Sequence, residues 1–210
     1  MKQKPVILFI ALLISSILNV FADSPLTSTD FSKAYLNESI IAQASNAKGV
    51  LTDQLMDYLI DQNKPIAIKM ALINKLGWNS KGKSNSLRFF TYLNEKRGYV
   101  NEADFIVSAK GDELLSMAYL KAMDNYFVVD EAIKYAEFAL KCNKQSFTYQ
   151  IIAALIKAQK SLDDDWCKVY RLADVVRKNT SLKKDIKTEA IAIIFEYMEG
   201  YKDNCTNQKH

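Results

Sequence analysis

Apolar residues recur at helical spacing along most of the chain, and this pattern constrains the fold more than any other feature. In one segment Ala132, Ile133, Ala136, Ala139 and Leu140 fall on one face of a helix with about 3.6 residues per turn. The chain has only six Gly and three Pro, so it has few of the residues that sheet-rich folds use at turns. Hydrophobic residues make up 49% of the chain, enough for a folded core. We therefore predict an all-α protein.

Residues 1–22 have the order of features found in a secretory signal peptide. Basic residues precede an apolar run from Val6 to Leu18, and small side chains stand at Val20 and Ala22. The run is shorter than the roughly 20 apolar residues that cross a membrane. No Cys lies near Ala22 to carry a bacterial lipid anchor. We predict cleavage after Ala22, export to the periplasm or the medium, and no stable membrane anchor afterwards; an uncleaved helix is the alternative.

The rest of the chain is predicted to form one helical domain, residues 23–203, and a polar tail, residues 204–210. The net charge of the whole chain is +4, but removal of residues 1–22 takes away two lysines and no acidic residue. A nearly neutral domain does not favour nucleic acid as a partner, because phosphates are usually bound by a clustered basic face. The single His, His210, excludes His-based acid–base catalysis and His metal sites. We expect no metal and no cofactor.

Three cysteines, Cys142, Cys167 and Cys205, allow at most one internal disulfide in an oxidising compartment. The chain after Lys202 is polar and can fold back onto the helix that carries Cys167. If a disulfide forms, we therefore predict that it joins Cys167 to Cys205. Three free thiols are the alternative.

Capping residues divide the sequence into helices. Pro65 suits a first turn and Gly77 a left-handed C-cap, and they bound one predicted helix. Gly98 ends the next one. The remaining patterns predict one or two short helices before Gly49, a helix after Thr52, helices that begin at Gly111 and Asp130, and helices over residues 147–160, 163–178 and 183–201.

The second half of the chain shows a weak internal repeat. A shift of about 35 residues aligns Ala118 with Ala153, and this period is the length of one helix pair in a stacked array. Residues 130–140 resemble the second helix of a tetratricopeptide repeat, with alanines where that family needs small side chains. The resemblance covers residues 112–178 and lacks the Trp and Gly of the family's first helix. It implies stacked antiparallel helix hairpins in an α-α superhelix; an irregular bundle of hairpins is the alternative.

One segment matches the phosphate-loop motif of nucleotide-binding proteins. Residues 77–84 read Gly-Trp-Asn-Ser-Lys-Gly-Lys-Ser, in which Lys83 and Ser84 would contact phosphate and magnesium. That motif must follow a buried strand of a parallel sheet, whereas residues 65–76 have a helical pattern. We predict a helix end and a polar turn here, and a nucleotide-binding protein is the least favoured function.

Glu38 and Ser39, followed by Gly49 and Gln54, resemble the catalytic region of lytic transglycosylases. Those enzymes use a Glu in an apolar cleft as the general acid. In this chain only Gly49 remains of the glycine-rich segment, and the spacing differs. An exported cell-wall lytic enzyme is therefore the alternative function, and an exposed helical Glu38 is the expectation.

No catalytic pattern remains, so we predict a non-enzymatic protein that binds a protein or peptide on a surface between stacked helices. Small residues are expected where the helices approach closely: Ala118, Ala132, Ala139 and Ala153. The first helix of each pair would line the inner face. The side chains predicted to contact the partner are Tyr119, Lys121, Gln150 and Lys157.

Overall fold

The computed structural model describes residues 24–77 and 82–206, and every regular element within them is helical. The prediction of an all-α protein is confirmed, whereas the predicted signal peptide, residues 1–22, lies outside the described residues. No helix in the described ranges has the length and apolar character needed to cross a membrane.

The elements are η1 (Phe31–Tyr35), α2 (Ser39–Asn46), α3 (Asp53–Ile60), α4 (Ile66–Gly77), α5 (Asn85–Arg97), α6 (Glu102–Ser108), α7 (Gly111–Asp124), α8 (Asp130–Cys142), α9 (Phe147–Ser161), α10 (Trp166–Lys178), α11 (Thr188–Met198) and η2 (Glu199–Cys205).

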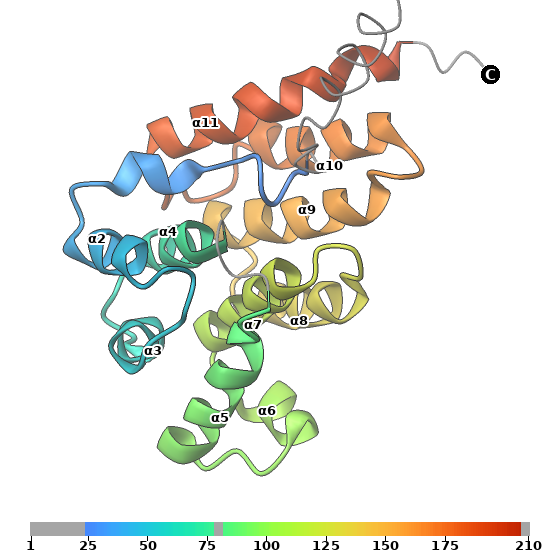
Figure 1. The fold of residues 1–210 in the computed structure, drawn as a ribbon. Helices are drawn as coiled ribbons and strands as arrows, with labels where there is room; N and C mark the ends of the chain where they lie inside the picture. Colours follow the sequence, from blue (N-terminus) through green and yellow to red (C-terminus); the bar gives the residue numbers. More distant parts are fainter. Residues whose placement is uncertain (1–23, 78–81, 207–210) are drawn as a thin grey trace, which may run out of the picture.

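The helices of the second half pack in chain order. Helix α7 packs against α8, α8 against α9, and α9 against α10. Figure 1 shows α11 at the end of the molecule opposite α5 and α6. Side chains with a single methyl group allow close approach of helix backbones, and the four alanines named above are all buried: Ala118, Ala132, Ala139 and Ala153.

The start of α7 is closely packed against α4, α8 and α9. A Cβ atom on Gly111 would lie 2.8 Å from Cys142 Cβ and 2.9 Å from the Tyr149 hydroxyl, so only glycine fits without displacing them. Asp112 accepts hydrogen bonds from the buried Lys69 ammonium at 2.6 Å and from the Tyr149 hydroxyl at 2.5 Å. The ion pair with Asp112 compensates the buried charge of Lys69, which would otherwise be unfavourable in the core.

Asn74 holds the irregular N-terminal segment onto α4. Its buried side-chain amide donates to the Thr29 carbonyl and to the Tyr119 hydroxyl, both at 3.0 Å, and its oxygen accepts from the Ser32 N–H at 3.0 Å. Because a buried amide without partners is unfavourable, this geometry fixes the position of η1.

Asn85 plays a similar part for the turn before α3. Its side chain accepts from the Leu51 N–H at 2.9 Å and donates to the Gly49 carbonyl at 2.8 Å. The carboxylate of Asp124, at the end of α7, accepts from the N–H groups of Asn85 and Ser86 at 3.0 and 2.7 Å. The first turn of α5 is thus capped by a residue from another helix.

The last helix starts later than the sequence predicts, because residues 183–187 form a loop and α11 begins at Thr188. Asp185 in this loop accepts from the Thr148 N–H at 2.9 Å and from the Ser146 hydroxyl at 2.5 Å. An isolated bridge between Ser146 and Lys183 holds the same loop to the start of α9. The backbone groups that a helix would use are therefore engaged with another element.

Two other details differ from the sequence prediction. Helix α6 was not predicted; its N-cap Asn101 accepts from the Asp104 N–H at 3.0 Å. Gly77 ends α4 without the left-handed backbone that we expected. A Cβ atom there would overlap Met123 Cε at 1.6 Å, so this glycine serves the close approach of α4 to α7.

Candidate functional site

Tyr119 does not belong to a partner-binding surface, which corrects the prediction. Its side chain is fully buried and stacks beside the ring of Phe31. Burial raises the pKa of its hydroxyl group, and that hydroxyl accepts the hydrogen bond from Asn74. Helical spacing placed Tyr119 on the expected face of α7, but η1 and α4 cover that face.

The structure places two of the other three predicted contact residues, Lys121 and Lys157, on different sides of α8. Lys121 forms an ion pair with Glu131 at 2.8 Å and lies over the ring of Tyr135, whereas Lys157 pairs with Glu137 at 3.0 Å. At about 100° per residue, Tyr135 and Glu137 point about 200° apart around α8. Lys121 and Lys157 therefore lie on different sides of this helix.

Gln150 is partly exposed, and its side-chain amide donates to the Lys144 carbonyl at 2.9 Å. Its polar group is thus used within the protein, as those of Lys121 and Lys157 are.

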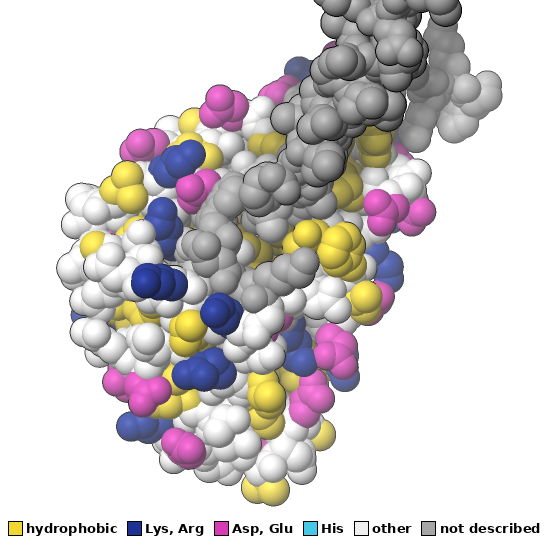
Figure 2. Space-filling model, in the orientation of Figure 1, with side chains coloured by type: hydrophobic (Ala, Val, Ile, Leu, Met, Phe, Trp, Pro, Cys, Tyr) yellow, Lys and Arg dark blue, Asp and Glu magenta, His cyan; other side chains and the backbone are white. Residues whose placement is uncertain are grey.

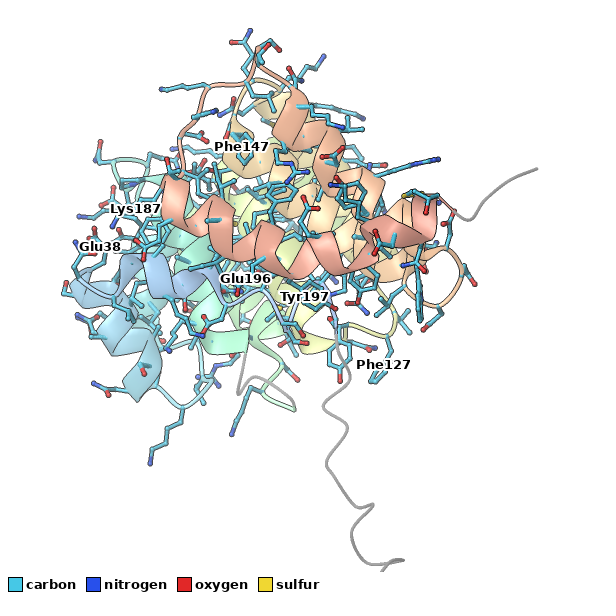
Figure 3. The ribbon with its side chains drawn as sticks, turned by 90° about the horizontal axis from the view of Figure 1, so that it is seen from above. Glu38, Phe127, Phe147, Lys187, Glu196 and Tyr197 are labelled. Atoms are coloured by element: carbon cyan, nitrogen blue, oxygen red, sulfur yellow. A yellow bond between two sulfur atoms is a disulfide. The ribbon has the colours of Figure 1, made fainter. Side chains whose placement is uncertain are left out.

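The structure places both motif segments at helix ends. Glu38 is the N-cap residue of α2, and it stands far from Phe127 and close to Lys187 in Figure 3. In the phosphate-loop segment, residues 78–81 lie outside the described residues, but the element before Gly77 is helix α4 rather than a strand. Lys83 is exposed, and α5 begins two residues later, at Asn85.

The structure brings together a hollow that the sequence analysis missed, between the α9–α10 turn and the C-terminal helices. It has a volume of about 600 Å³. We call it the Trp166 hollow, and it is lined by Leu162, Asp163, Trp166, Glu196, Tyr197, Gly200, Tyr201 and Asn204. Trp166 is 55% exposed, which is unusual for so large an apolar side chain.

The aromatic rings of the Trp166 hollow stand at steep angles to one another. The planes of Trp166 and Tyr201 meet at 82°, with ring centroids 6.3 Å apart, and those of Tyr197 and Tyr201 meet at 65°. The Trp166 indole N–H donates to the Leu162 carbonyl at 2.8 Å, and the hydroxyl groups of Tyr197 and Tyr201 are hydrogen-bonded at 2.5 Å. These bonds hold the rings as walls of a concave site.

A disulfide fixes the two sides of this hollow relative to each other. It joins Cys167 to Cys205, the pair named in the sequence analysis, and the adjacent residues Trp166 and Asn204 both line the hollow. Cys142 is free and exposed.

Ion pairs also tie α10 to η2. Arg177 contacts the carboxylates of Asp174 at 2.5 Å and Glu199 at 2.6 Å. Burial alone would raise the pKa of Asp174, but hydrogen bonds from Lys178 and Arg177 outweigh it and lower that pKa.

A second hollow adjoins the first and shares Leu162 and Asp163 with it. Its volume is about 320 Å³, and we call it the Phe127 hollow. Two side chains of the α7–α8 turn stand out from the surface here, Phe127 at 74% and Val128 at 64% exposure. Figure 2 shows hydrophobic side chains gathered where this turn lies in Figure 1, and Figure 3 shows Tyr197 and Phe127 on the same side of the molecule. The lining comprises Ser24, Tyr126, Phe127, Val129, Asp130, Gln159, Lys160, Leu162 and Asp163.

We refer to the two adjoining hollows, which share Leu162 and Asp163, as the aromatic groove. In the part of the chain that the structure describes, no group of three His, Cys, Asp or Glu side chains is placed to hold a metal ion. Comparison of the chain with protein-family models, with curated proteins and with solved structures finds no match. The site's own geometry therefore carries the functional argument.

Proposed function

We propose that this is an exported, non-enzymatic helical-repeat protein that binds an extended segment of a partner protein along the aromatic groove. The observation that carries the proposal is the exposure of Trp166 and Phe127 on either side of Leu162 and Asp163. Large aromatic side chains are enriched at the energetic centres of protein interfaces, because they bury much apolar area at a low cost in conformational entropy.

The shape of the groove supports an extended partner segment. Two adjoining hollows that share a wall can receive neighbouring side chains of one peptide. The Phe127 hollow offers an aromatic rim for an apolar side chain, because Tyr126 and Phe127 lie with ring centroids 4.4 Å apart. Apolar contact at this rim and polar contact at Asp163 would together set the direction of the peptide.

Two features support the rest of the proposal. Export rests on the signal-peptide pattern of residues 1–22, and an oxidising compartment would preserve the disulfide between Cys167 and Cys205. A repeat architecture rests on the resemblance of residues 112–178 to tetratricopeptide repeats, since helices α7 to α10 pack in succession as stacked pairs would.

The proposal is tested by selecting peptides that bind the protein without residues 1–22 from a displayed random-peptide library. We expect the selected peptides to lose at least about tenfold in affinity when Phe127→Ser and Trp166→Ala are combined, because two aromatic contact points are removed. Calorimetry measures the affinity, and circular dichroism checks that the helical content is unchanged.

Val107→Ser is the matched control, because Val107 is 85% exposed on α6, at the other end of the molecule. It removes an exposed apolar side chain outside the groove and should leave affinity unchanged. A library that yields no binding peptide, or peptides whose affinity is insensitive to the groove variant, would contradict the proposal.

A further inference from the structure

We propose that the Trp166 hollow receives a cationic side chain of the partner segment, a lysine or an arginine. This inference rests on the proposed function and names the chemistry that the hollow selects. Three aromatic rings and two carboxylates line one concave site, and each of these groups interacts favourably with a cation.

The carboxylates of the hollow are not neutralised by the described part of the protein. Asp163 is exposed at the α9–α10 turn and Glu196 is exposed on α11, and neither forms an ion pair with any residue in the ranges 24–77 and 82–206. Figure 3 shows Glu196 and Tyr197 on the same helix. A cation in the hollow would thus meet negative charge that the protein has left available.

Two basic residues of α10 and η2, Arg177 and Lys202, are engaged with other groups of the protein. Arg177 lies over the rings of Tyr170 and Phe195 and pairs with Asp174 and Glu199. Lys202 also pairs with Glu199, at 3.4 Å.

The rings of Tyr170 and Phe195 lie under Arg177, whereas no cation of the described chain lies over the face of Trp166. Trp is the aromatic side chain that attracts cations most strongly. Its indole N–H is held by the Leu162 carbonyl, so the ring is already oriented before a ligand binds. Such preorganisation lowers the entropy cost of binding.

The aromatic rings alone would also suit an apolar side chain. A pair of ligands that differ only in charge distinguishes binding of a cation from binding of an apolar side chain. The probe is a Gly-Lys-Gly peptide blocked at both ends, so that its only charge is the lysine ammonium. The same peptide with an Nε-acetylated lysine keeps the length and loses the charge.

The titration is followed by the indole N–H resonance of Trp166 in nuclear magnetic resonance spectra. The chain has two Trp residues, so a Trp78→Phe background leaves Trp166 as the single indole. We expect a saturable shift with the lysine peptide and at least about threefold weaker binding of the acetylated peptide. A tenfold increase in salt concentration should lower the affinity for the lysine peptide, because salt screens its attraction to Asp163 and Glu196.

Glu196→Gln tests the carboxylate, and we expect an affinity loss of about threefold for the lysine peptide. Glu189→Gln is its matched control, because Glu189 is exposed on the same helix and does not line the hollow. Equal binding of the charged and acetylated peptides would overturn the inference, as would equal effects of the two substitutions.

The failure of this inference can be distinguished from failure of the proposed function. If library-selected peptides depend on Phe127 and Trp166 but bind equally well after their lysines are acetylated and their arginines replaced by Gln, the groove binds peptides and the cation inference is wrong. If the library yields no binding peptide, the proposed function is wrong, and the tripeptide titration alone decides whether the hollow binds cations.

Discussion

The surface predicted from the sequence and the aromatic groove differ in how their side chains are already used. On the predicted surface Lys121 and Lys157 are held by acidic residues of α8, and Tyr119 is buried. In the groove Trp166 and Phe127 project into solvent. A partner gains little from groups whose internal contacts it must first replace. The comparison teaches that exposure and unused bonding capacity, rather than position on a helix face, identify a binding surface.

The largest effect on the groove should come from removing its covalent support. Cys167→Ser combined with Cys205→Ser opens a disulfide with a sequence separation of 38, and closure of a loop of that size stabilises a protein by about 3 to 4 kcal/mol. Chemical denaturation should show this loss, and the affinity for a selected peptide should fall because Trp166 and Asn204 are no longer held together.

Cys142→Ser is the control for this experiment, since Cys142 is a free, exposed thiol. It should change neither stability nor affinity appreciably. Unchanged stability of the double variant would show that the disulfide does not support the groove.

A smaller loss of stability is expected when the Tyr119 hydroxyl is removed, and it tests whether Tyr119 is a structural residue or a contact residue. Tyr119→Phe removes the hydroxyl that accepts from the Asn74 amide and leaves the ring in place. We expect a stability loss of about 1 kcal/mol, because a buried donor loses one partner. Peptide affinity should not change, and a change in affinity at unaltered stability would return Tyr119 to the binding surface.

The pH dependence of stability should also differ between the two regions. The pKa of Asp174 is lowered in the folded protein, so its contribution is complete above its ordinary pKa of about 3.8 and is lost as the pH falls through the lower, folded value. The pKa of Glu131 is lowered too, by its hydrogen bond from Lys121, but the Glu131 side chain is 72% exposed and water screens the pair.

We therefore expect Asp174→Asn to flatten the loss of stability in acid, and Glu131→Gln to change it little. Urea denaturation at neutral pH and at pH values below about 4 measures both. Equal flattening by the two substitutions would contradict the difference between the regions.

The sequence predicted the helical class because periodicity and capping are local properties of the chain. It predicted less well where one segment is shaped by a distant one. Residues 183–187 have a helical composition, but Asp185 caps α9 instead. Asn74 is a polar residue in an apolar pattern, and its partners Thr29 and Tyr119 are remote in sequence.

The aromatic groove could not be found from helical periodicity, because it is assembled at the ends of helices. Trp166 begins α10, Leu162 follows α9, and Tyr201 lies in η2. The residues around Trp166 carried one usable signal, a polar run from Asp163 to Asp165 followed by an aromatic side chain next to a cysteine.

The most direct test of the central claim compares the two surfaces with one ligand. A library-selected peptide is titrated by calorimetry into the protein without residues 1–22, into the Phe127→Ser, Trp166→Ala variant, and into the Lys121→Glu, Lys157→Glu variant. We predict that the groove variant loses at least about tenfold in affinity and the charge-reversed variant stays within about twofold of the parent. Retention of binding by the groove variant together with its loss from the charge-reversed variant would contradict the account and favour the surface predicted from the sequence.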